Sequence, residues 1–374
     1  MCRTKEQQRA LVDGSELIVE SCVRAGADVF IGYPITPANR IFEYSGSRFR
    51  VVLAAPDEIT ALQWMAGFSA TGKLPVTATS FPGLALMVES INMAYMMELP
   101  MVIILVQRLG PSTGSATIGA QGDLSLVSGL ISGGYPLPTL CLSGIEDCWE
   151  MPAVAVNTAI ALRSPVILLT SKEMVMTTRS FDTATLGEIA PARWNLHTGA
   201  ETYRPYDPEE NLVPRFLPLG DDHHQVRLTS SSHDRHGLLR HGDSEALANT
   251  LRLREKVERN LSTYLHYELD EEDAEILVVS YGVTALAARE AVHTLRGAGR
   301  KVSLLVAKTL VPLPSVYLEI MERYPRVVIA EENQDGQLRH LLFGQRGRSG
   351  VSGVNAIGRL VDPQDILRDV DAHG

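Results

Sequence analysis

The run Met101-Val-Ile-Ile-Leu-Val106 decides the fold class, because its residues are all apolar and show no alternation with polar positions. A strand that is apolar throughout is typical of a parallel sheet, in which helices bury both faces. Shorter β-rich runs lie on either side of it in the sequence. The runs that we predict as further strands are residues 29–33, 51–55, 76–79 and 165–170.

Helical patterns separate these runs. Ile59, Leu62 and Met65 recur at helical spacing after Asp57, which is a predicted N-cap. Glu58 falls in the first turn, where the helix dipole favours a carboxylate. Further helices are predicted over residues 83–97 and 150–162. The alternation of strands and helices predicts a doubly wound α/β domain over residues 1–180.

Residues 181–270 differ in composition from the part before them. Pro, Gly and polar residues dominate until a helical pattern over residues 244–267. The Pro-rich and aromatic content predicts a connector that wraps the domains and packs on a surface before it enters this helix. From residue 271 the alternation resumes and predicts a second, smaller α/β domain over residues 271–374. Its predicted strands are 275–281, 301–306 and 327–332, and its predicted helices are 283–295 and 316–323.

The composition limits the partners and the cellular compartment. Lys and Arg number 34 and Asp and Glu 44, and a net charge of −10 disfavours nucleic acid or an anionic membrane as a partner. We expect a soluble cytoplasmic protein, since the first eight residues lack a signal peptide's apolar stretch and the apolar runs are too short to span a bilayer. The cysteines form no C-x-x-C pair, which disfavours a disulfide scaffold, an iron–sulfur cluster or structural zinc within this chain. They are Cys2, Cys22, Cys141 and Cys148.

Four segments with polar residues or glycines fall at strand ends or in the turns after them, where open α/β sheets bind ligands. The polar residues in these segments also have ordinary structural explanations. Thr36 begins a helix, Glu58 interacts favourably with a helix dipole, and Arg108 forms a surface ion pair. The glycine-rich run after Arg108 lacks the Gly-Lys-Ser/Thr ending of a P-loop. The segments are Gly32-Tyr-Pro-Ile-Thr36-Pro, Pro56-Asp-Glu58-Ile, Thr79-Ser-Phe-Pro-Gly83 and Gln107-Arg108-Leu-Gly-Pro-Ser-Thr-Gly114, the last running on to Ala120-Gln-Gly-Asp123.

Histidines gather in the connector, at His223, His224, His233, His236 and His241. His236 and His241 have the spacing of a zinc-finger histidine pair, but no cysteine pair precedes them. A solvated connector is therefore favoured over a zinc site, and we predict no metal ligands in this chain.

In their order, the strand-end motifs closely resemble the α subunits of the 2-oxoacid:ferredoxin oxidoreductases, above all the 2-oxoglutarate type. The resemblance spans nearly the whole chain. It implies a pyrimidine-type domain that binds thiamine diphosphate, with a doubly wound, mainly parallel sheet, and a smaller transketolase-C-like α/β domain. Its later motifs are Arg163-Ser-Pro-Val, Ser232-His-Asp-Arg-His-Gly, Lys308-Thr-Leu-Val-Pro-Leu-Pro and Glu331-Glu-Asn-Gln-Asp-Gly-Gln.

The resemblance also implies an activity, cofactors and partners. The activity is the oxidative decarboxylation of a 2-oxoacid, 2-oxoglutarate being the first expectation, with coenzyme A as co-substrate and ferredoxin as electron acceptor. A β subunit is expected to carry the diphosphate and Mg²⁺ site and an iron–sulfur cluster, within an (αβ)₂ assembly that shares thiamine diphosphate. The lack of a Gly-Asp-Gly…Asn diphosphate motif and of cluster cysteines in this chain agrees with that division.

The resemblance assigns roles to individual residues. Glu58 matches the catalytic glutamate that bonds to the pyrimidine ring of the cofactor, and burial suits a carboxylate whose protonation must be tuned. Thr36 and Arg108 match positions that face the 2-oxoacid, where a guanidinium can bind a carboxylate bidentately. The positions matched as close to the cofactor are Tyr33, Pro34, Ile35, Ser80, Phe81, Gly83 and Asp123.

The chain departs from the family pattern at three places. Phe81 and Leu109 stand where the family usually has glycine, and Pro56 where it has glutamate. Because Phe81 and Leu109 are bulky and apolar, a hydrophobic or aromatic 2-oxoacid stays open. So do two other functions. One is a chain of a two-chain thiamine-diphosphate decarboxylase, which the predicted second domain disfavours. The other is a non-catalytic paralogue, which the presence of Glu58, Thr36 and Arg108 disfavours.

Overall fold

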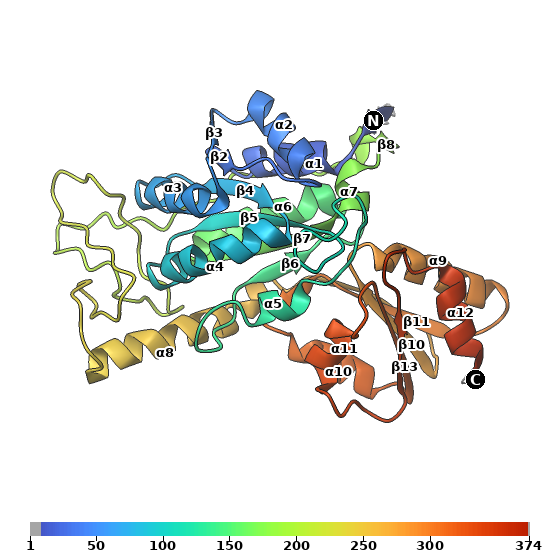
Figure 1. The fold of residues 1–374 in the computed structure, drawn as a ribbon. Helices are drawn as coiled ribbons and strands as arrows, with labels where there is room; N and C mark the ends of the chain where they lie inside the picture. Colours follow the sequence, from blue (N-terminus) through green and yellow to red (C-terminus); the bar gives the residue numbers. More distant parts are fainter. Residues whose placement is uncertain (1–8, 373–374) are drawn as a thin grey trace, which may run out of the picture.

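The computed structural model describes residues 9–372 and contains a seven-stranded and a five-stranded sheet, drawn in Figure 1. The predictions for residues 1–8, Cys2 included, lie outside the described residues. The order of the larger sheet is β12-β6-β7-β5-β4-β2-β3, and its neighbours are parallel except for β12, which is antiparallel to β6. Its strands are β2 (Val29–Gly32), β3 (Val51–Ala54), β4 (Pro75–Thr79), β5 (Met101–Gln107), β6 (Thr139–Cys141), β7 (Pro165–Ser171) and β12 (Thr309–Val311).

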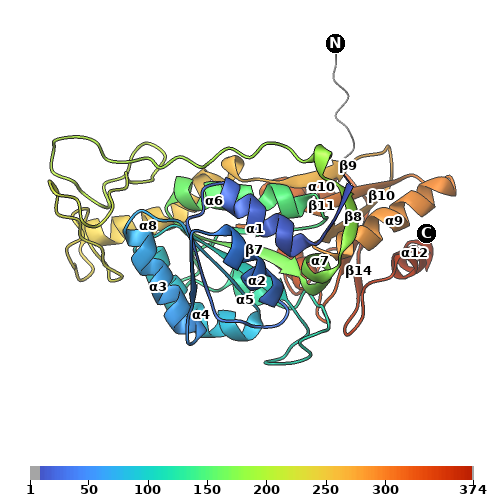
Figure 2. The same ribbon diagram turned by 90° about the horizontal axis from the view of Figure 1, so that it is seen from above.

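Strand β5 contains the apolar run and is buried along its whole length between β4 and β7, as its sequence predicts. Helices cover the sheet on two sides: α1 packs on α6, α3 packs on α4, and Figure 2 shows these pairs on opposite sides. The doubly wound α/β fold is therefore confirmed. These elements are α1 (Gly14–Arg24), α2 (Asn39–Arg48), α3 (Glu58–Ala70), α4 (Phe81–Met96), α5 (Leu124–Ser128), α6 (Asp147–Leu162) and α7 (Lys172–Met176).

The smaller sheet has the order β14-β13-β10-β11-β9, with only β9 antiparallel to its neighbour. Helices α9 and α12 pack over a separate hydrophobic cluster on this sheet. Among the described residues, no helix is long and apolar enough to cross a membrane. The elements are β9 (Tyr267–Asp270), β10 (Ile276–Tyr281), α9 (Thr284–Gly297), β11 (Val302–Ala307), α10 (Ser315–Glu322), β13 (Arg326–Glu331), α11 (Gln337–Phe343), β14 (Val351–Asn355) and α12 (Pro363–Ala372).

The helix predicted over residues 244–267 is wrong in its last part. Helix α8 (Ser244–Arg259) ends at Asn260, and after the short 3-10 turn Leu261–Thr263 the chain enters β9. Strand β9 forms because it pairs with β11, a partner about 35 residues later that local periodicity does not reveal. Five further strands were not predicted: β6, β12 and β14 in the two large sheets, and β1 (Arg9–Val12) and β8 (Arg179–Asp182), which pair antiparallel with each other.

The connector lies to the left in Figure 1 and reaches α8. Arg163, at the end of α6, holds it by donating from Nη1 to the carbonyl oxygens of Pro205 and Arg215, each at 2.9 Å. His233 is buried, stacks on Tyr206 with ring centroids 3.8 Å apart, and contacts the Ser231 carbonyl oxygen. The prediction of a solvated connector is therefore wrong for His233, because an aromatic neighbour covers it.

A buried ion cluster joins α8 to the larger sheet. Glu98, in the turn between α4 and β5, is fully buried and accepts hydrogen bonds from Arg252 and from Lys256 Nζ, the latter at 2.7 Å. Although burial acts to raise it, the two cations hold the pKa of Glu98 well below its ordinary value. Helix α8 is thus attached through charges as well as through apolar contacts.

Candidate active site

The predicted site residues lie at one edge of the larger sheet, where the parallel strands β2, β4, β5 and β7 end, called here the carboxyl edge. Thr36 follows β2, Ser80 follows β4 and Arg108 follows β5. Tyr33 and Pro34 are exposed in the turn after β2, and Ile35 and Thr36 are half-buried there. In open α/β sheets this edge is where ligands bind.

Arg108 and Thr36 are joined across the end of β4. The Arg108 Nη1 donates to the Thr36 backbone oxygen at 2.5 Å, and β4 lies between the strands that the two residues follow. Arg108 is buried, and its Nε has no partner. Burial lowers the pKa of this guanidinium, and the nearby Asp123 carboxyl acts in the opposite direction. One buried arginine with a free N–H thus lies over the centre of the edge.

Asp123 lies beside Arg108 as the N-cap residue of α5, but its side chain makes no capping bond. The carboxyl group is buried, and its Oδ2 has no hydrogen-bond partner. Burial raises the pKa of Asp123 to about 7, whereas Gln107 and Arg108 act to lower it. At neutral pH this group therefore exists in both protonation states.

Glu58 is the first residue of α3, where Asp57 caps the helix by accepting from the Thr60 N–H at 2.7 Å, as predicted. The Glu58 side chain is buried against Gly83 of α4. A Cβ on Gly83 would lie 2.5 Å from Glu58 Oε1 and 2.1 Å from Thr79 Oγ1, so only glycine fits. Burial raises the pKa of Glu58, helped by the charge of Asp57 and opposed by its own backbone N–H.

Buried polar atoms without partners gather at the carboxyl edge. Such atoms are rare in folded proteins unless a ligand or water satisfies them. Here they include both donors and acceptors, which suits a polar ligand or cofactor. They are Asn39 Oδ1, Ser80 Oγ, Gln107 Nε2, Arg108 Nε, Asp123 Oδ2 and Thr170 Oγ1.

The structure thus brings the predicted residues together at the ends of the neighbouring strands β5, β4, β2 and β3. Glu58 packs against Gly83, Arg108 bonds to Thr36 and interacts electrostatically with Asp123, and Ser80 follows the strand between Arg108 and Thr36. Phe81 is half-buried at the first position of α4, and Leu109 is half-buried directly after Arg108. Thr79 and Gln107 begin two of the predicted segments but were not among the predicted site residues, because neutral side chains carry no charge signal.

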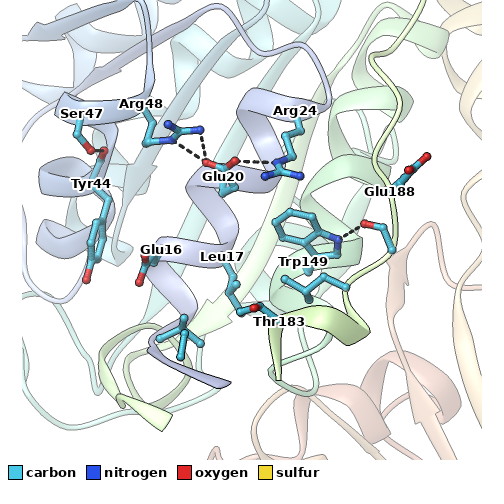
Figure 3. Close-up of a pocket in the computed structure, with 14 residues that line it drawn as sticks. Glu16, Leu17, Glu20, Arg24, Tyr44, Ser47, Arg48, Trp149, Thr183 and Glu188 are labelled. Carbon is cyan, nitrogen blue, oxygen red and sulfur yellow. Dashed lines mark hydrogen bonds and ion pairs between the residues drawn. The ribbon is translucent and has the colours of Figure 1, made fainter. Parts of the chain in front are cut away.

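A groove of about 740 Å³ lies elsewhere, between α1, the end of α2 and residues 183–188 (Figure 3). Its charges are largely paired with one another: Glu20 accepts from Arg24 Nε at 2.7 Å and from Arg48 Nε at 2.6 Å. Trp149 Nε1 donates to the Gly187 oxygen at 2.8 Å. The buried polar atoms without hydrogen-bond partners therefore gather at the carboxyl edge rather than in this groove. In the part of the chain that the structure describes, no three His, Cys, Asp or Glu side chains group as a metal site.

A parallel sheet whose carboxyl edge holds a buried acid and a buried guanidinium is the arrangement of an α/β enzyme. The family model described as pyruvate flavodoxin/ferredoxin oxidoreductase, thiamine diP-bdg, matches residues 20–240. Two relatives are similar over most of the chain. A 2-oxoglutarate synthase subunit KorA from Methanocaldococcus jannaschii is 29% identical, over 86% of this chain and 88% of its own length. A ketoisovalerate oxidoreductase subunit VorB from Methanothermobacter thermautotrophicus is 31% identical, over 96% of each.

Among solved structures, a 2-oxoglutarate:ferredoxin oxidoreductase from Magnetococcus marinus, with 2-oxoglutarate, coenzyme A and succinyl-CoA bound, superposes with a TM-score of 0.91. It is 27% identical, and the match covers 99% of this chain and 66% of that chain. The protein therefore belongs to the 2-oxoacid:ferredoxin oxidoreductase family, as a subunit of an oxidoreductase. This confirms the family that the motifs predict.

Proposed function

We propose that this chain is the α subunit of a thiamine-diphosphate-dependent 2-oxoacid:ferredoxin oxidoreductase. The reaction converts a 2-oxoacid and coenzyme A into an acyl-CoA, carbon dioxide, a proton and two electrons, which ferredoxin accepts. The observation that carries the proposal is the buried Glu58 carboxylate against Gly83, at the edge where unpartnered polar atoms gather. When bound, thiamine diphosphate supplies an electron sink for the loss of carbon dioxide.

Glu58 is the residue of this chain that would hold the pyrimidine ring of the cofactor. Its carboxyl lies where a side chain on residue 83 would fill the space, and burial raises its pKa above that of an ordinary carboxyl group, which suits a group that exchanges a proton with the ring. Ser80 Oγ, buried and unpartnered at the start of α4, offers a further polar contact. These groups fit a flat, polar heterocycle.

Arg108 is proposed to bind the carboxylate of the 2-oxoacid. Its Nη1 is fixed by the Thr36 oxygen, which orients the guanidinium and leaves the buried Nε–H free. An arginine in a site shielded from water binds a carboxylate strongly, because water does not screen the charge-assisted hydrogen bonds between them there. Thr36 then contributes by holding Arg108 as well as by facing the substrate.

The apolar outer faces of α3 and α4 are evidence that a partner subunit binds there. Each helix has one charged residue, Glu58 in α3 and Glu89 in α4, yet each keeps large apolar side chains exposed. Ile59 is 42% exposed, Trp64 40% and Leu86 51%. Helices that are apolar all round are normally buried, so a second protein surface is expected over them. We propose that a β subunit covers this face, carrying the diphosphate and Mg²⁺ site and an iron–sulfur cluster, in an (αβ)₂ assembly.

We propose 2-oxoglutarate as the substrate. Relatives named for 2-oxoglutarate and for ketoisovalerate are about equally similar to the chain. The half-buried Phe81 and Leu109 favour an apolar 2-oxoacid as the alternative, because they place hydrocarbon next to Ser80 and Arg108.

The test is an anaerobic assay of this chain co-expressed with its neighbouring reading frame. The assay contains thiamine diphosphate, Mg²⁺, coenzyme A, a viologen dye and a panel of 2-oxoacids. Dye reduction that depends on coenzyme A and on one acid is the expected result, and it identifies the substrate. Carbon dioxide release without dye reduction would replace the proposal with a decarboxylase, and a complex that binds no thiamine diphosphate would indicate a non-catalytic paralogue.

A further inference from the structure

Gln121 connects the loop after β5 to the smaller sheet through both its side chain and its backbone. Its Nε2 donates to the Tyr281 oxygen at 2.8 Å, and its Oε1 accepts from Thr284 Oγ1 at 2.7 Å and from the Glu332 N–H at 2.8 Å. Its backbone N–H donates to the Glu332 oxygen at 2.7 Å, and its backbone oxygen accepts from Asn333 Nδ2 at 3.1 Å. All these partners follow strands β10 and β13 or end them.

The fit around Gln121 leaves no room for adjustment. A Cβ on Gly282 would lie 2.3 Å from Gln121 Nε2, and Gly282 has a φ of +59°, so the contact requires glycine on both counts. Tyr281 and Thr284, on either side of Gly282, supply two of the bonds. The amide is therefore held in one orientation.

A second glutamine, at the start of helix α11, bonds to the same loop at residues that follow Gln121 in the chain. Gln337, at the start of α11, donates from Nε2 to the Gly122 oxygen and accepts from the Ser125 N–H, both at 2.9 Å. Helices α5 and α11 are in contact and lie side by side in Figure 1. Asp123 lies between these two attachment points in the chain, and its carboxyl group interacts electrostatically with Arg108.

We propose that Gln121 and Gln337 are positioning residues: they clamp the loop around Asp123 to the smaller sheet, so that its carboxyl stays within electrostatic reach of Arg108. This inference rests on the proposed role of Arg108 in binding the 2-oxoacid. An ionised Asp123 competes with the substrate carboxylate for the guanidinium, whereas a protonated Asp123 leaves Arg108 free. The titratable and polar groups that face Asp123 are Gln107 and Arg108 at the end of β5 and Tyr281 at the end of β10.

The clamp makes a specific kinetic prediction. In the wild-type complex, the KM for the 2-oxoacid rises as the pH passes about 7, where Asp123 ionises. A loosened loop admits water to Asp123, which lowers its pKa towards that of an ordinary carboxyl group and moves the rise in KM to lower pH. The kcat and the KM for coenzyme A should change little, because the proposal links the loop only to the binding of the 2-oxoacid by Arg108.

The experiment compares Gln337→Leu and Gln121→Leu with Gln334→Leu in the co-expressed complex. Gln334 is exposed three residues before Gln337 and is the matched control. We expect Gln337→Leu to raise the KM for the 2-oxoacid about tenfold at pH 7.5, with kcat within about twofold, and to shift the pH profile downwards. Hydrogen exchange of residues 119–128 should quicken in both clamp variants and stay unchanged in Gln334→Leu.

The outcomes separate the inference from the function on which it rests. Faster exchange with an unchanged KM and an unchanged pH profile would overturn the positioning role while leaving the proposed function intact. Unchanged exchange in Gln337→Leu would show that no clamp exists. If Gln121→Leu does not fold, Gln337→Leu still decides the question. A wild-type complex that converts no 2-oxoacid would refute the proposed function and the role of the clamp with it.

Discussion

The Glu98 carboxylate accepts two hydrogen bonds from the Arg252 guanidinium, 154 residues further along the chain, and both side chains are buried. Lys256 bonds to the same carboxylate, and burial lowers the pKa of its amine to about 8. A single acid thus compensates two buried cations where α8 meets the larger sheet. If the Glu98 carboxylate is removed, the buried charges of Arg252 and Lys256 lose the acid that balances them.

Glu98→Gln is therefore expected to destabilise the protein by about 3–5 kcal/mol, the usual cost of leaving a buried ion without its partner. The shift in the midpoint of urea unfolding measures this effect. The matched control is Glu258→Gln on α8, whose ion pair with Arg254 is exposed, and it should leave the midpoint nearly unchanged. Equal shifts in the two variants would mean that burial of the Glu98 pair is unimportant.

Gly83→Ala should disturb the active site through one methyl group. The added Cβ would collide with Glu58 Oε1 and Thr79 Oγ1, so we expect a loss of about 1–3 kcal/mol in stability and weaker binding of thiamine diphosphate. Gly46→Ala is the control, because Gly46 lies in α2 where a Cβ meets nothing and alanine favours a helix. Calorimetry and cofactor titration of both complexes make the comparison, and normal cofactor affinity in Gly83→Ala would count against the site.

Glu58→Gln should lower turnover by about 10²–10⁴-fold, the range found when a general acid–base group is lost, while the assembly stays intact. The near-identical shape of glutamine preserves packing against Gly83 but cannot take up a proton. Dye reduction and gel filtration give the two readouts. Glu255→Gln, exposed on α8, serves as the control, and retained activity in Glu58→Gln would remove Glu58 from the mechanism.

Phe81→Gly should change the choice of 2-oxoacid more than it changes the fold. Phe81 is half-buried at the first position of α4, so its removal opens space beside Ser80 at little cost to the helix. We expect the ratio of kcat/KM values between 2-oxoglutarate and a branched-chain 2-oxoacid to shift severalfold. Phe81→Leu, which keeps an apolar side chain, should give an intermediate ratio. Identical ratios across the panel would show that Phe81 does not contact the substrate.

Stability should also depend on pH through Glu332. Burial and the Glu173 charge raise its pKa from the ordinary value of a glutamate to about 7, while the Val361 N–H opposes this. The folded state then binds a proton that the unfolded state has released, so stability is full below pH 4.5 and falls as the pH rises towards and through 7. Glu332→Gln should reduce this loss by on the order of 1 kcal/mol between pH 5 and 8. Unfolding temperatures at both pH values measure it, with the exposed Glu319→Gln keeping the wild-type dependence.

Local signals predicted much of this fold. The sequence around Asp57 and Glu58 defines a helix start within four residues, and β5 is apolar throughout, so no distant partner is needed to recognise either element. The end of α8 was mispredicted because β9 depends on its pairing with β11. The division of the chain at residues 180 and 270 stays a prediction, as do the roles of the site residues.

The clamp shows why the rest of the site could not be predicted. Gln121 is neutral, and its partners lie 160 and 211 residues away, so neither charge nor spacing marks it. The motif that contains it was recognised, but only as part of an ordered series. His233 was misjudged for a similar reason, because the aromatic ring that buries it belongs to a distant part of the connector.

Strand β12 has a consequence for the synthesis of the protein. It completes the edge of a sheet whose other strands all precede residue 172, and about 140 residues separate it from the end of β7. At a translation rate of about 5–20 residues per second, β6 waits roughly 10–30 s on the ribosome for its partner. During that interval the nascent chain carries an open strand edge, the kind of surface that templates wrong pairing unless a chaperone covers it.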